Sequence, residues 1–296
     1  MRGVYRLRQI HRHFRARYLR ARAQCRVARF PRVTAGRAHE LSAPLVITLT
    51  SYPPRFPALG KTLRSLLDQE VRAERVELWI AEHDLDQLSR DIRELEDHGL
   101  SIRPCRDLRS YKKLIPALEQ EPGNFYVTAD DDVYYPPEWL GHLAATAQRH
   151  PGEVIATRAH MAFTQADGLL APYADWGLAT ARESVGEEGA FLFPTGVGGV
   201  LYPPGCFDPQ VLDEAAFMEL CPRGDDIWFF WMARLAGTRH RRIPEWFDVV
   251  EWPQTQEVAL YNDNLLSDGN DRQIAAMESR FGPVPDLAAK QRASAK

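Results

Sequence analysis

Short apolar runs separated by amphipathic segments are the feature that most constrains the fold of this chain. Brief runs rich in β-branched and aromatic residues, typical of strands buried in a parallel sheet, lie at 45–50 (LVITLT), 75–81 (RVELWIA), 100–103 and 124–129 (NFYVTA). Segments with helical spacing of apolar residues lie between them, at 58–68, 86–98 and 112–120. Because strand and helix alternate, we expect an α/β fold with an open, mostly parallel sheet flanked by helices.

The second half of the chain has a less regular pattern. Strands are predicted at 153–157 and 197–202, and helices at 208–220 and 225–237. A long, glycine-containing segment at 162–192 has no readable pattern. A final helix and a polar tail are predicted after about residue 266.

The formal net charge of −3 conceals a basic arm joined to an acidic body. Residues 1–40 contain 12 Arg, no Lys and one acidic residue, whereas the rest of the chain carries 25 basic and 39 acidic residues. Mostly apolar positions recur in the arm at alternating spacings of three and four, which predicts an amphipathic helix. We expect this helix to lie on an anionic membrane surface, where each basic side chain contributes about 1 kcal/mol. The alternative is a helix covered by solvent or by a partner.

Missing patterns exclude several classes of protein. The four cysteines form no CxxC pair, which excludes a zinc ribbon or a dense disulfide framework and suits a reducing compartment. The sequence contains no run of 18 apolar residues, so it predicts no membrane-spanning helix. The run PTGVGGVLYPPG (194–205) permits close backbone approach to a ligand but matches neither a P-loop nor a dinucleotide fingerprint. No nucleic-acid partner is expected, since no nucleic-acid fold signature accompanies the charge of the arm.

Three consecutive aspartates, Asp130, Asp131 and Asp132, follow the strand at 124–129 and precede a Pro-Pro break. Ligands of open α/β sheets bind at such strand ends. Adjacent carboxylates repel one another, and a divalent cation removes that cost. In an extended stretch the first and third carboxylates point to one side, so Asp130 and Asp132 can share Mg²⁺, Mn²⁺ or Ca²⁺. The alternative is a solvated acidic turn.

A second acidic pair, Asp225 and Asp226, follows Gly224 and opens an apolar, aromatic helix. One acid at a helix start stabilises the free backbone N–H groups and the positive end of the dipole. A single aspartate suffices for that role. The other is then free to act as a general base toward a hydroxyl nucleophile.

Polar residues after other predicted strands can complete a nucleotide site. The loop after the first strand offers groups that suit a nucleobase and a phosphate, on Thr50, Ser51, Tyr52 and Arg55. Glu82 and Asp84 follow the next strand and suit hydrogen bonds to a base or ribose. Lys112 and Lys113 precede the aspartate strand, where an ammonium group neutralises phosphate charge. The alternatives are a plain turn for the loop and surface positions for the lysines.

Taken together, these residues resemble a GT-A fold glycosyltransferase of the family 2-like bacterial group. The matching stretches are LVITLTSYPPRF, LWIAEHD, YKKLIPAL, NFYVTADDDVYYPPEWL, VGGVLYPPG and CPRGDDIWFFWMA, in this order over residues 45–237. We therefore expect a chain of three parts. These are a basic amphipathic arm (1–40), a GT-A domain (41–265, with a nucleotide-sugar half at 41–157 and an acceptor half at 158–265), and a C-terminal helix and tail (266–296).

The resemblance implies an enzyme that moves a sugar, with inversion, from a nucleotide-diphospho-sugar to a hydroxyl of a glycan or lipid-linked acceptor in bacterial surface polysaccharide synthesis. Asp132 and Asp130 would hold Mn²⁺ or Mg²⁺. The nucleotide-sugar would contact Thr50, Ser51, Tyr52, Arg55, Glu82, Lys113, Asp130 and Asp131. The second acidic motif of the family often reads Glu-Asp, and here it reads Gly224-Asp225-Asp226. The catalytic base therefore stays open between Asp226 and Asp225.

Two other functions remain as alternatives. A nucleotidyltransferase also places paired aspartates at a strand end, but it favours a glycine-rich basic loop after the first strand, and TSYPPRF is not one. A non-catalytic binding protein could keep the fold and recruit a partner through its arm. For the transferase we expect the body in the cytoplasm, with the arm on the inner face of a bacterial membrane.

Overall fold

A seven-stranded sheet forms the centre of the molecule, which is described by a computed structural model for residues 2–33, 36–253 and 269–287. Its strands are β1 (Leu45–Thr50), β2 (Arg75–Ala81), β3 (Leu100–Cys105), β4 (Phe125–Ala129), β6 (Val154–Ala156), β9 (Val200–Tyr202) and β10 (His240–Arg242). Across the sheet the order is β10-β6-β9-β4-β1-β2-β3. Only β9 runs antiparallel to its neighbours. The prediction of an open, mostly parallel α/β sheet is confirmed.

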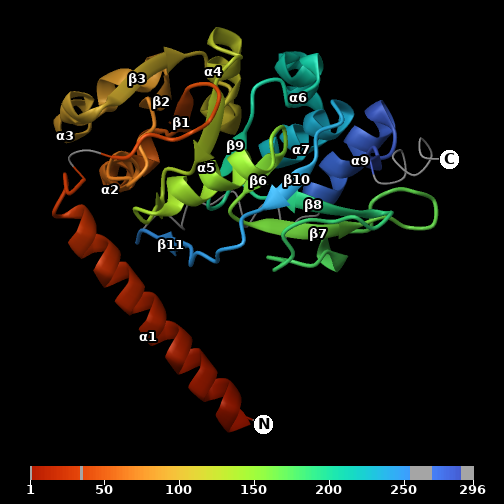
Figure 1. The fold of residues 1–296 in the computed structure, drawn as a ribbon, viewed down its shortest axis with the longest axis horizontal. Coiled ribbons are helices and arrows are strands. Elements are labelled where there is room, and N and C mark those ends of the chain that lie inside the picture. Colours follow the sequence, from red (N-terminus) through yellow and green to blue (C-terminus); the bar gives the residue numbers. More distant parts are fainter. Residues whose placement is uncertain (1, 34–35, 254–268, 288–296) are drawn as a thin grey trace.

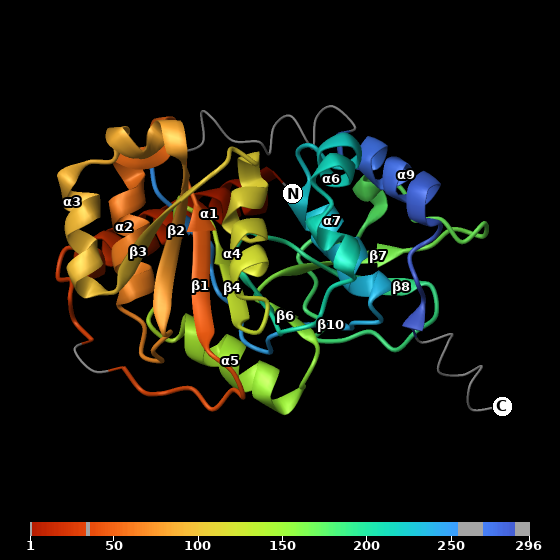
Figure 2. The same cartoon turned by 90° about the horizontal axis from the view of Figure 1, so that it is seen from above.

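Helices cover both faces of this sheet (Figures 1 and 2). One face packs against α4 (Ile115–Gln120), α6 (Glu214–Leu220), α7 (Asp225–Leu235) and α9 (Gly269–Phe281). The other packs against α2 (Phe56–Leu67), α3 (Arg90–Arg93) and α5 (Trp139–Arg149). Successive residues of β1 show why: Val46 lies in the first core, and Ile47 and Leu49 lie in the second. A strand buried on both faces needs apolar residues at nearly every position, as in LVITLT.

The structure corrects the prediction at several elements. The helix expected at 86–98 is two 3-10 turns around the short α3, and strands β5 (Val133–Tyr134), β10 and β11 (Val250–Glu251) were not predicted. The predicted helix at 208–220 is divided into a 3-10 turn (Pro209–Leu212) and α6, because the Asp213 carboxylate accepts a hydrogen bond from the Ala216 N–H and starts a new helix. Helix α5 was not predicted. The segment without a pattern is bounded by an antiparallel hairpin of β7 (Ala159–Phe163) and β8 (Ala190–Pro194). Parts of the expected tail, 288–296, and of the domain boundary, 254–268, lie outside the described residues.

The basic arm forms one long helix, α1 (Arg2–Val27), which projects from the body (Figure 1). Its C-terminal part packs on the body, with Ala23 and Val27 buried against Ala58 and Trp252. Beside this contact a two-stranded ribbon pairs β11 (Val250–Glu251) with β5 (Val133–Tyr134). Among the described residues, no helix is both long and apolar enough to cross a membrane.

Gly199, directly before β9, lies in close contact with Trp139 and with the backbone of β4. Its φ is +96°, and an added Cβ would lie 2.5 Å from Cζ2 of Trp139 and 3.0 Å from the carbonyl oxygen of Thr128. We expect Gly199→Ala to destabilise the protein by about 2–5 kcal/mol, because left-handed backbone costs about 1–2 kcal/mol and overpacking about 1–3 kcal/mol. Gly152→Ala is the matched control, since Gly152 also has positive φ but open space around it. Urea unfolding should show the larger loss for Gly199→Ala, and equal losses would contradict the packing argument.

Candidate active site

Three segments that are distant in sequence meet at the carboxyl end of β4. The aspartates that follow Ala129, the 3-10 turn η4 (Arg109–Lys113) and the first turn of α7 lie together there. The chain turns directly after β4, where the Asp130 N–H donates a hydrogen bond to the hydroxyl of Tyr135 at 2.7 Å. The side chains of the aspartate run and of the second acidic pair are thereby brought to one site.

Asp131 and Asp132 share one guanidinium. Arg55 Nη1 lies 2.7 Å from Oδ1 of Asp131 and 2.9 Å from Oδ2 of Asp132. The Ser51 hydroxyl donates to Oδ2 of Asp131 at 2.5 Å, and the Thr62 hydroxyl donates to its carbonyl oxygen at 2.9 Å. Asp131 is therefore held on both its side chain and its backbone, and the loop after β1 positions the aspartate run.

Lys113 joins the two acidic motifs. Its Nζ lies 2.7 Å from Oδ2 of Asp225 and 3.9 Å from Oδ1 of Asp130, and the side chain is buried. Burial opposes the charge of the ammonium group, but Asp225, Asp130 and Asp226 outweigh it and hold the pKa of Lys113 well above its ordinary value. The sequence predicted that the Lys113 ammonium neutralises phosphate charge at this site. In the structure its partners are the carboxylates of Asp225 and Asp130.

Asp226 faces the glycine-rich run. Its Oδ2 accepts a hydrogen bond from the Gly196 N–H at 2.8 Å. A Cβ at Gly196 would lie 2.9 Å from Oδ1 of Asp226 and 3.1 Å from Nζ of Lys113. Only glycine therefore allows the backbone to approach the carboxylate and the ammonium this closely.

Burial raises the pKa of three of the carboxyl groups. For Asp130 the main cause is burial, which Lys113 partly opposes. Burial and Asp130 raise the pKa of Asp132 to about 7, and burial and Asp225 raise that of Asp226 to about 7. For Asp132 and Asp226, a small change in surroundings therefore determines whether the carboxyl group is ionised at neutral pH.

The sequence did not predict one residue that holds the backbone of the aspartate run, Trp252. The Trp252 N–H donates to the carbonyl oxygen of Asp132 at 2.9 Å, and the Trp252 indole donates to the Thr62 hydroxyl at 2.9 Å. Strand β11, which ends beside Trp252, is the strand on which α1 packs. No local pattern near Trp252 indicates a partner more than a hundred residues away.

The structure brings most of the predicted site residues together. Those joined by hydrogen bonds or ion pairs are Ser51, Arg55, Lys113, Asp130, Asp131, Asp132, Asp225 and Asp226. The Tyr52 ring lies beside Arg55, with 6.0 Å between the ring centroid and Cζ. The Thr50 hydroxyl instead donates to the carbonyl oxygen of Trp79. Glu82 is exposed at the end of β2, and no contact joins it to the aspartates among the described residues.

The charge balance of the site fits a divalent cation. Five carboxyl groups surround two cationic side chains, Arg55 and Lys113. Within the described ranges, no three acidic, His or Cys side chains are arranged to hold a metal by themselves. Mg²⁺ in phosphate-transfer sites is commonly bound by one or two carboxylates together with substrate phosphates. Asp130 and Asp132 suit that kind of site.

The raised pKa of Asp226 predicts a pH-dependent stability. Since the folded pKa is about 7 and the ordinary value is 3.8, the folded state binds this proton more tightly, and the resulting stability is lost as pH rises through that interval. Asn at this position cannot ionise but keeps an oxygen for the Gly196 N–H. In metal-free buffer, the free energy of unfolding of Asp226→Asn should exceed that of the wild type by an amount that grows between about pH 5 and pH 8 and reaches about 1–3 kcal/mol.

Urea unfolding at several pH values checks this prediction. Asp86→Asn is the control, because Asp86 is an exposed aspartate away from the site. The control should follow the wild type across the pH range. If Asp226→Asn also follows it, the carboxyl of Asp226 is not perturbed in the folded protein.

Comparisons with known proteins find similar solved structures only. No family model and no curated protein matches the chain. S. aureus TarS (residues 1–349) in complex with UDP is similar with a TM-score of 0.47 and 17% identity, over 68% of this chain and 58% of that one. Mannosyltransferase PcManGT from Pyrobaculum calidifontis, with GDP-Man and Mn²⁺, has a TM-score of 0.43 and 13% identity, over 98% and 89% of the two chains. Glucosyl-3-phosphoglycerate synthase from Mycobacterium tuberculosis, with Mn²⁺ and UDP, has a TM-score of 0.30 and 12% identity, over 39% and 43%.

Proposed function

We propose that this chain is a metal-dependent glycosyltransferase that moves a sugar from a nucleotide-diphospho-sugar to a hydroxyl of a glycan or lipid-linked acceptor. One observation carries the proposal: the aspartates at the end of β4 and the pair at the start of α7 meet around the buried Lys113. A cation-binding group and a base for a hydroxyl are thus available side by side. Their position at strand ends of an open α/β sheet is where such folds bind ligands.

On the donor side, Asp130 and Asp132 would hold Mn²⁺ or Mg²⁺, and a bound cation supplies Lewis-acid stabilisation of the leaving diphosphate. Arg55 and Ser51 contribute by fixing Asp131, so the neighbouring carboxylates keep their directions. Tyr52 offers a ring beside Arg55 on which a nucleobase can stack. The five carboxyl groups alone would repel a diphosphate, which is why the proposal includes a cation.

On the acceptor side, the geometry favours Asp226 over Asp225 as the base. Asp225 is held in an ion pair, with its Oδ2 2.7 Å from Nζ of Lys113. Asp226 accepts the Gly196 N–H, and its pKa is raised to about 7, close to the value that suits a general base at neutral pH. Asp226 takes the hydroxyl proton while the acceptor oxygen bonds to the anomeric carbon and the bond to the diphosphate breaks. Attack opposite the leaving group inverts the anomeric centre.

Replacement of the two aspartates tests this assignment. Asp226→Asn should lower the release of nucleoside diphosphate from the active nucleotide-sugar by about 10²–10⁴-fold, since the base is lost. It should keep the Mn²⁺-dependent rise in melting temperature that the donor produces, since the donor side is intact. Asp225→Asn is the comparison, and any loss of turnover there should be accompanied by a lower melting temperature, because it removes the ion-pair partner of Lys113. A panel of UDP- and GDP-sugars with Mn²⁺, and with EDTA as the metal-free control, provides both measurements.

Three outcomes would contradict the proposal in different ways. Release of pyrophosphate in place of nucleoside diphosphate would identify a nucleotidyltransferase. Donor binding without any turnover would identify a binding protein. Undiminished turnover in Asp226→Asn would leave the transferase in place and remove its base.

We further propose that α1 lies on an anionic membrane surface. Three arginines of the arm, Arg17 and Arg22 on α1 and Arg29 in the turn that follows it, are exposed and make no hydrogen bond or ion pair with the described part of the body. Phe14 and Tyr18 are 65% and 64% exposed on the same helix. Exposed aromatic residues among arginines suit the boundary between lipid headgroups and acyl chains.

Vesicle sedimentation tests this role of the arm. Replacing Arg17, Arg22 and Arg29 together with Gln should weaken binding to phosphatidylglycerol-containing vesicles by about two orders of magnitude, at about 1 kcal/mol for each charge. The fold should be unaffected, because the packed face of α1 is unchanged. Vesicles of phosphatidylcholine alone are the control and should bind neither protein. Equal binding of both proteins to the anionic vesicles would exclude the role.

A further inference from the structure

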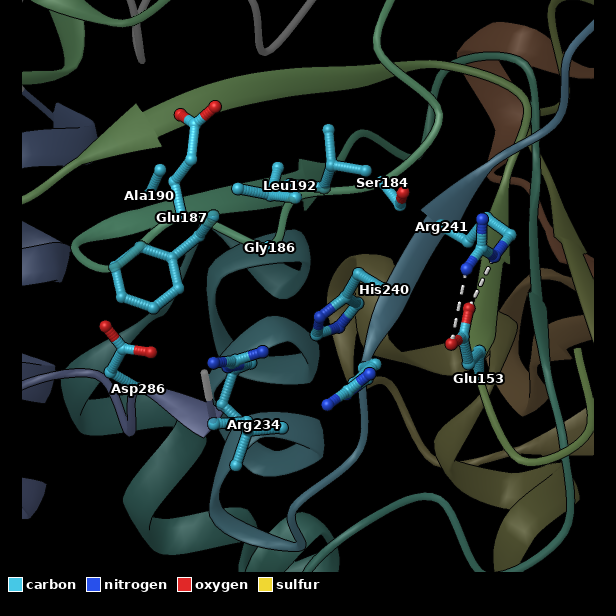
Figure 3. A pocket seen from close by; sticks show the side chains of 14 residues that line it. Glu153, Ser184, Gly186, Glu187, Ala190, Leu192, Arg234, His240, Arg241 and Asp286 are labelled. Atoms are coloured by element: carbon cyan, nitrogen blue, oxygen red, sulfur yellow. Dashed lines mark hydrogen bonds and ion pairs between the residues drawn. The ribbon is translucent and has the colours of Figure 1, made fainter. Parts of the chain in front are cut away.

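A cavity of about 410 Å³ lies at the opposite end of α7 from Asp225 and Asp226. Its walls come from the last turn of α7, β8, β10, the loop at 184–187 and residues 286–287 (Figure 3). Eight residues separate Asp226 from Arg234, which is about 12 Å along a helix. None of the residues of the candidate active site lines this cavity. Its size is within the range of small-molecule sites.

The acidic side chains of the cavity are already engaged. Glu153 lies 2.6 Å from Nε of Arg241, and Glu187 lies 3.0 Å from Nη1 of Arg182. The Asp286 carboxylate accepts a hydrogen bond from the Gly189 N–H at 2.8 Å. Both glutamates are thus paired with arginines. Burial lowers the pKa of Arg234 to about 10, and the charge of Asp286 partly opposes this shift.

Two arginines of the cavity lack an ion-pair partner among the described residues. Arg234 is 8% exposed, and its guanidinium, over the Phe191 ring, donates from Nε and Nη2 to the carbonyl oxygen of Pro285. Its Nη1 has no acceptor within the described part of the chain. Arg239 is exposed and makes no side-chain ion pair or hydrogen bond there either. A buried guanidinium that only a carbonyl satisfies retains capacity for an anion.

His240 adds a polar group that packs on the Phe230 ring, at 5.1 Å between centroids, but has no hydrogen-bond partner among the described residues. It is 7% exposed, and its ring makes no hydrogen bond in the described structure, with Nδ1 buried. Figure 3 shows the side chains of His240 and Arg234 extending toward one another inside the cavity. Buried polar groups usually have partners, so an unpaired imidazole beside an unpaired guanidinium indicates a place for a ligand. Phe191, Leu192 and Ala190 form an apolar wall next to these groups.

We propose that this cavity binds the phosphate or carboxylate group of a small molecule, with Arg234, Arg239 and His240 as its contacts. The guanidinium groups meet the two oxygens of such an anion, and the imidazole contributes one further hydrogen bond. The apolar wall receives the remainder of the ligand. The site is separate from the proposed catalytic residues, and its occupation does not depend on whether the chain transfers a sugar.

Isothermal titration of the full chain in EDTA-containing buffer of constant ionic strength tests the proposal. Inorganic phosphate is the probe in one arm, and glucuronate, a sugar carboxylate, is the probe in the other. We expect saturable binding of at least one probe. Arg239→Gln should weaken that binding about tenfold or more, because a charge-assisted hydrogen bond is lost. Arg239 is exposed, so the variant should fold normally.

Two control variants separate this cavity from other anion sites. Arg90→Gln removes an exposed arginine on α3, and Asp226→Asn alters the candidate active site. Both should bind the probe like the wild type. The proposal is overturned if neither probe saturates, if Arg239→Gln binds as Arg90→Gln does, or if Asp226→Asn changes the affinity as much as Arg239→Gln.

Discussion

The buried ammonium of Lys113 is the interaction on which the arrangement of the candidate active site depends. It lies between carboxylates of two motifs that are 95 residues apart, from Asp130 to Asp225. The backbone of Lys113 is fixed as well, since the Thr48 hydroxyl of β1 donates to its carbonyl oxygen at 2.6 Å. Without this cation the acidic groups would repel one another in a site with little water, and loss of one partner of a buried ion pair costs about 3–5 kcal/mol. The ion pair therefore determines how α7 meets the end of β4.

A second line of contacts connects the arm to the same site. Ala23 and Val27 of α1 pack with Trp252, and the Trp252 N–H holds the backbone of Asp132. Arg26 donates to the hydroxyl of Tyr134, two residues after Asp132. The orientation of α1 is thereby linked to the orientation of the aspartate run. If α1 lies on a membrane, the same contacts determine how the site faces that surface.

Much of the fold could be predicted from the sequence, because strands buried on both faces have a distinctive apolar pattern and β1, β2 and β4 show it. The reversed direction of β9 could not be predicted, since an entirely apolar run such as VLY carries no information about strand direction. The aspartate run and Lys113 were found from their positions next to β4. Gly196 was predicted only as part of the run at 194–205 that permits close backbone approach, and Trp252 was not predicted at all. Each contacts a partner that is distant in sequence. Glu82 follows β2 at the expected edge of the sheet, yet no contact among the described residues joins it to the aspartates. A position at a strand end therefore does not by itself predict contact with the site.

The raised pKa values of Asp132 and Asp226 also argue against a purely structural role for these side chains. A carboxyl group whose folded pKa lies above its ordinary value makes its ionised form unfavourable in the folded protein at neutral pH. Asparagine would accept the Gly196 N–H equally well and would carry no such cost. The local contact of Asp226 is thus satisfied by an amide, whereas proton transfer requires a carboxylate. Buried acids that reduce stability are most readily explained by chemistry that needs them.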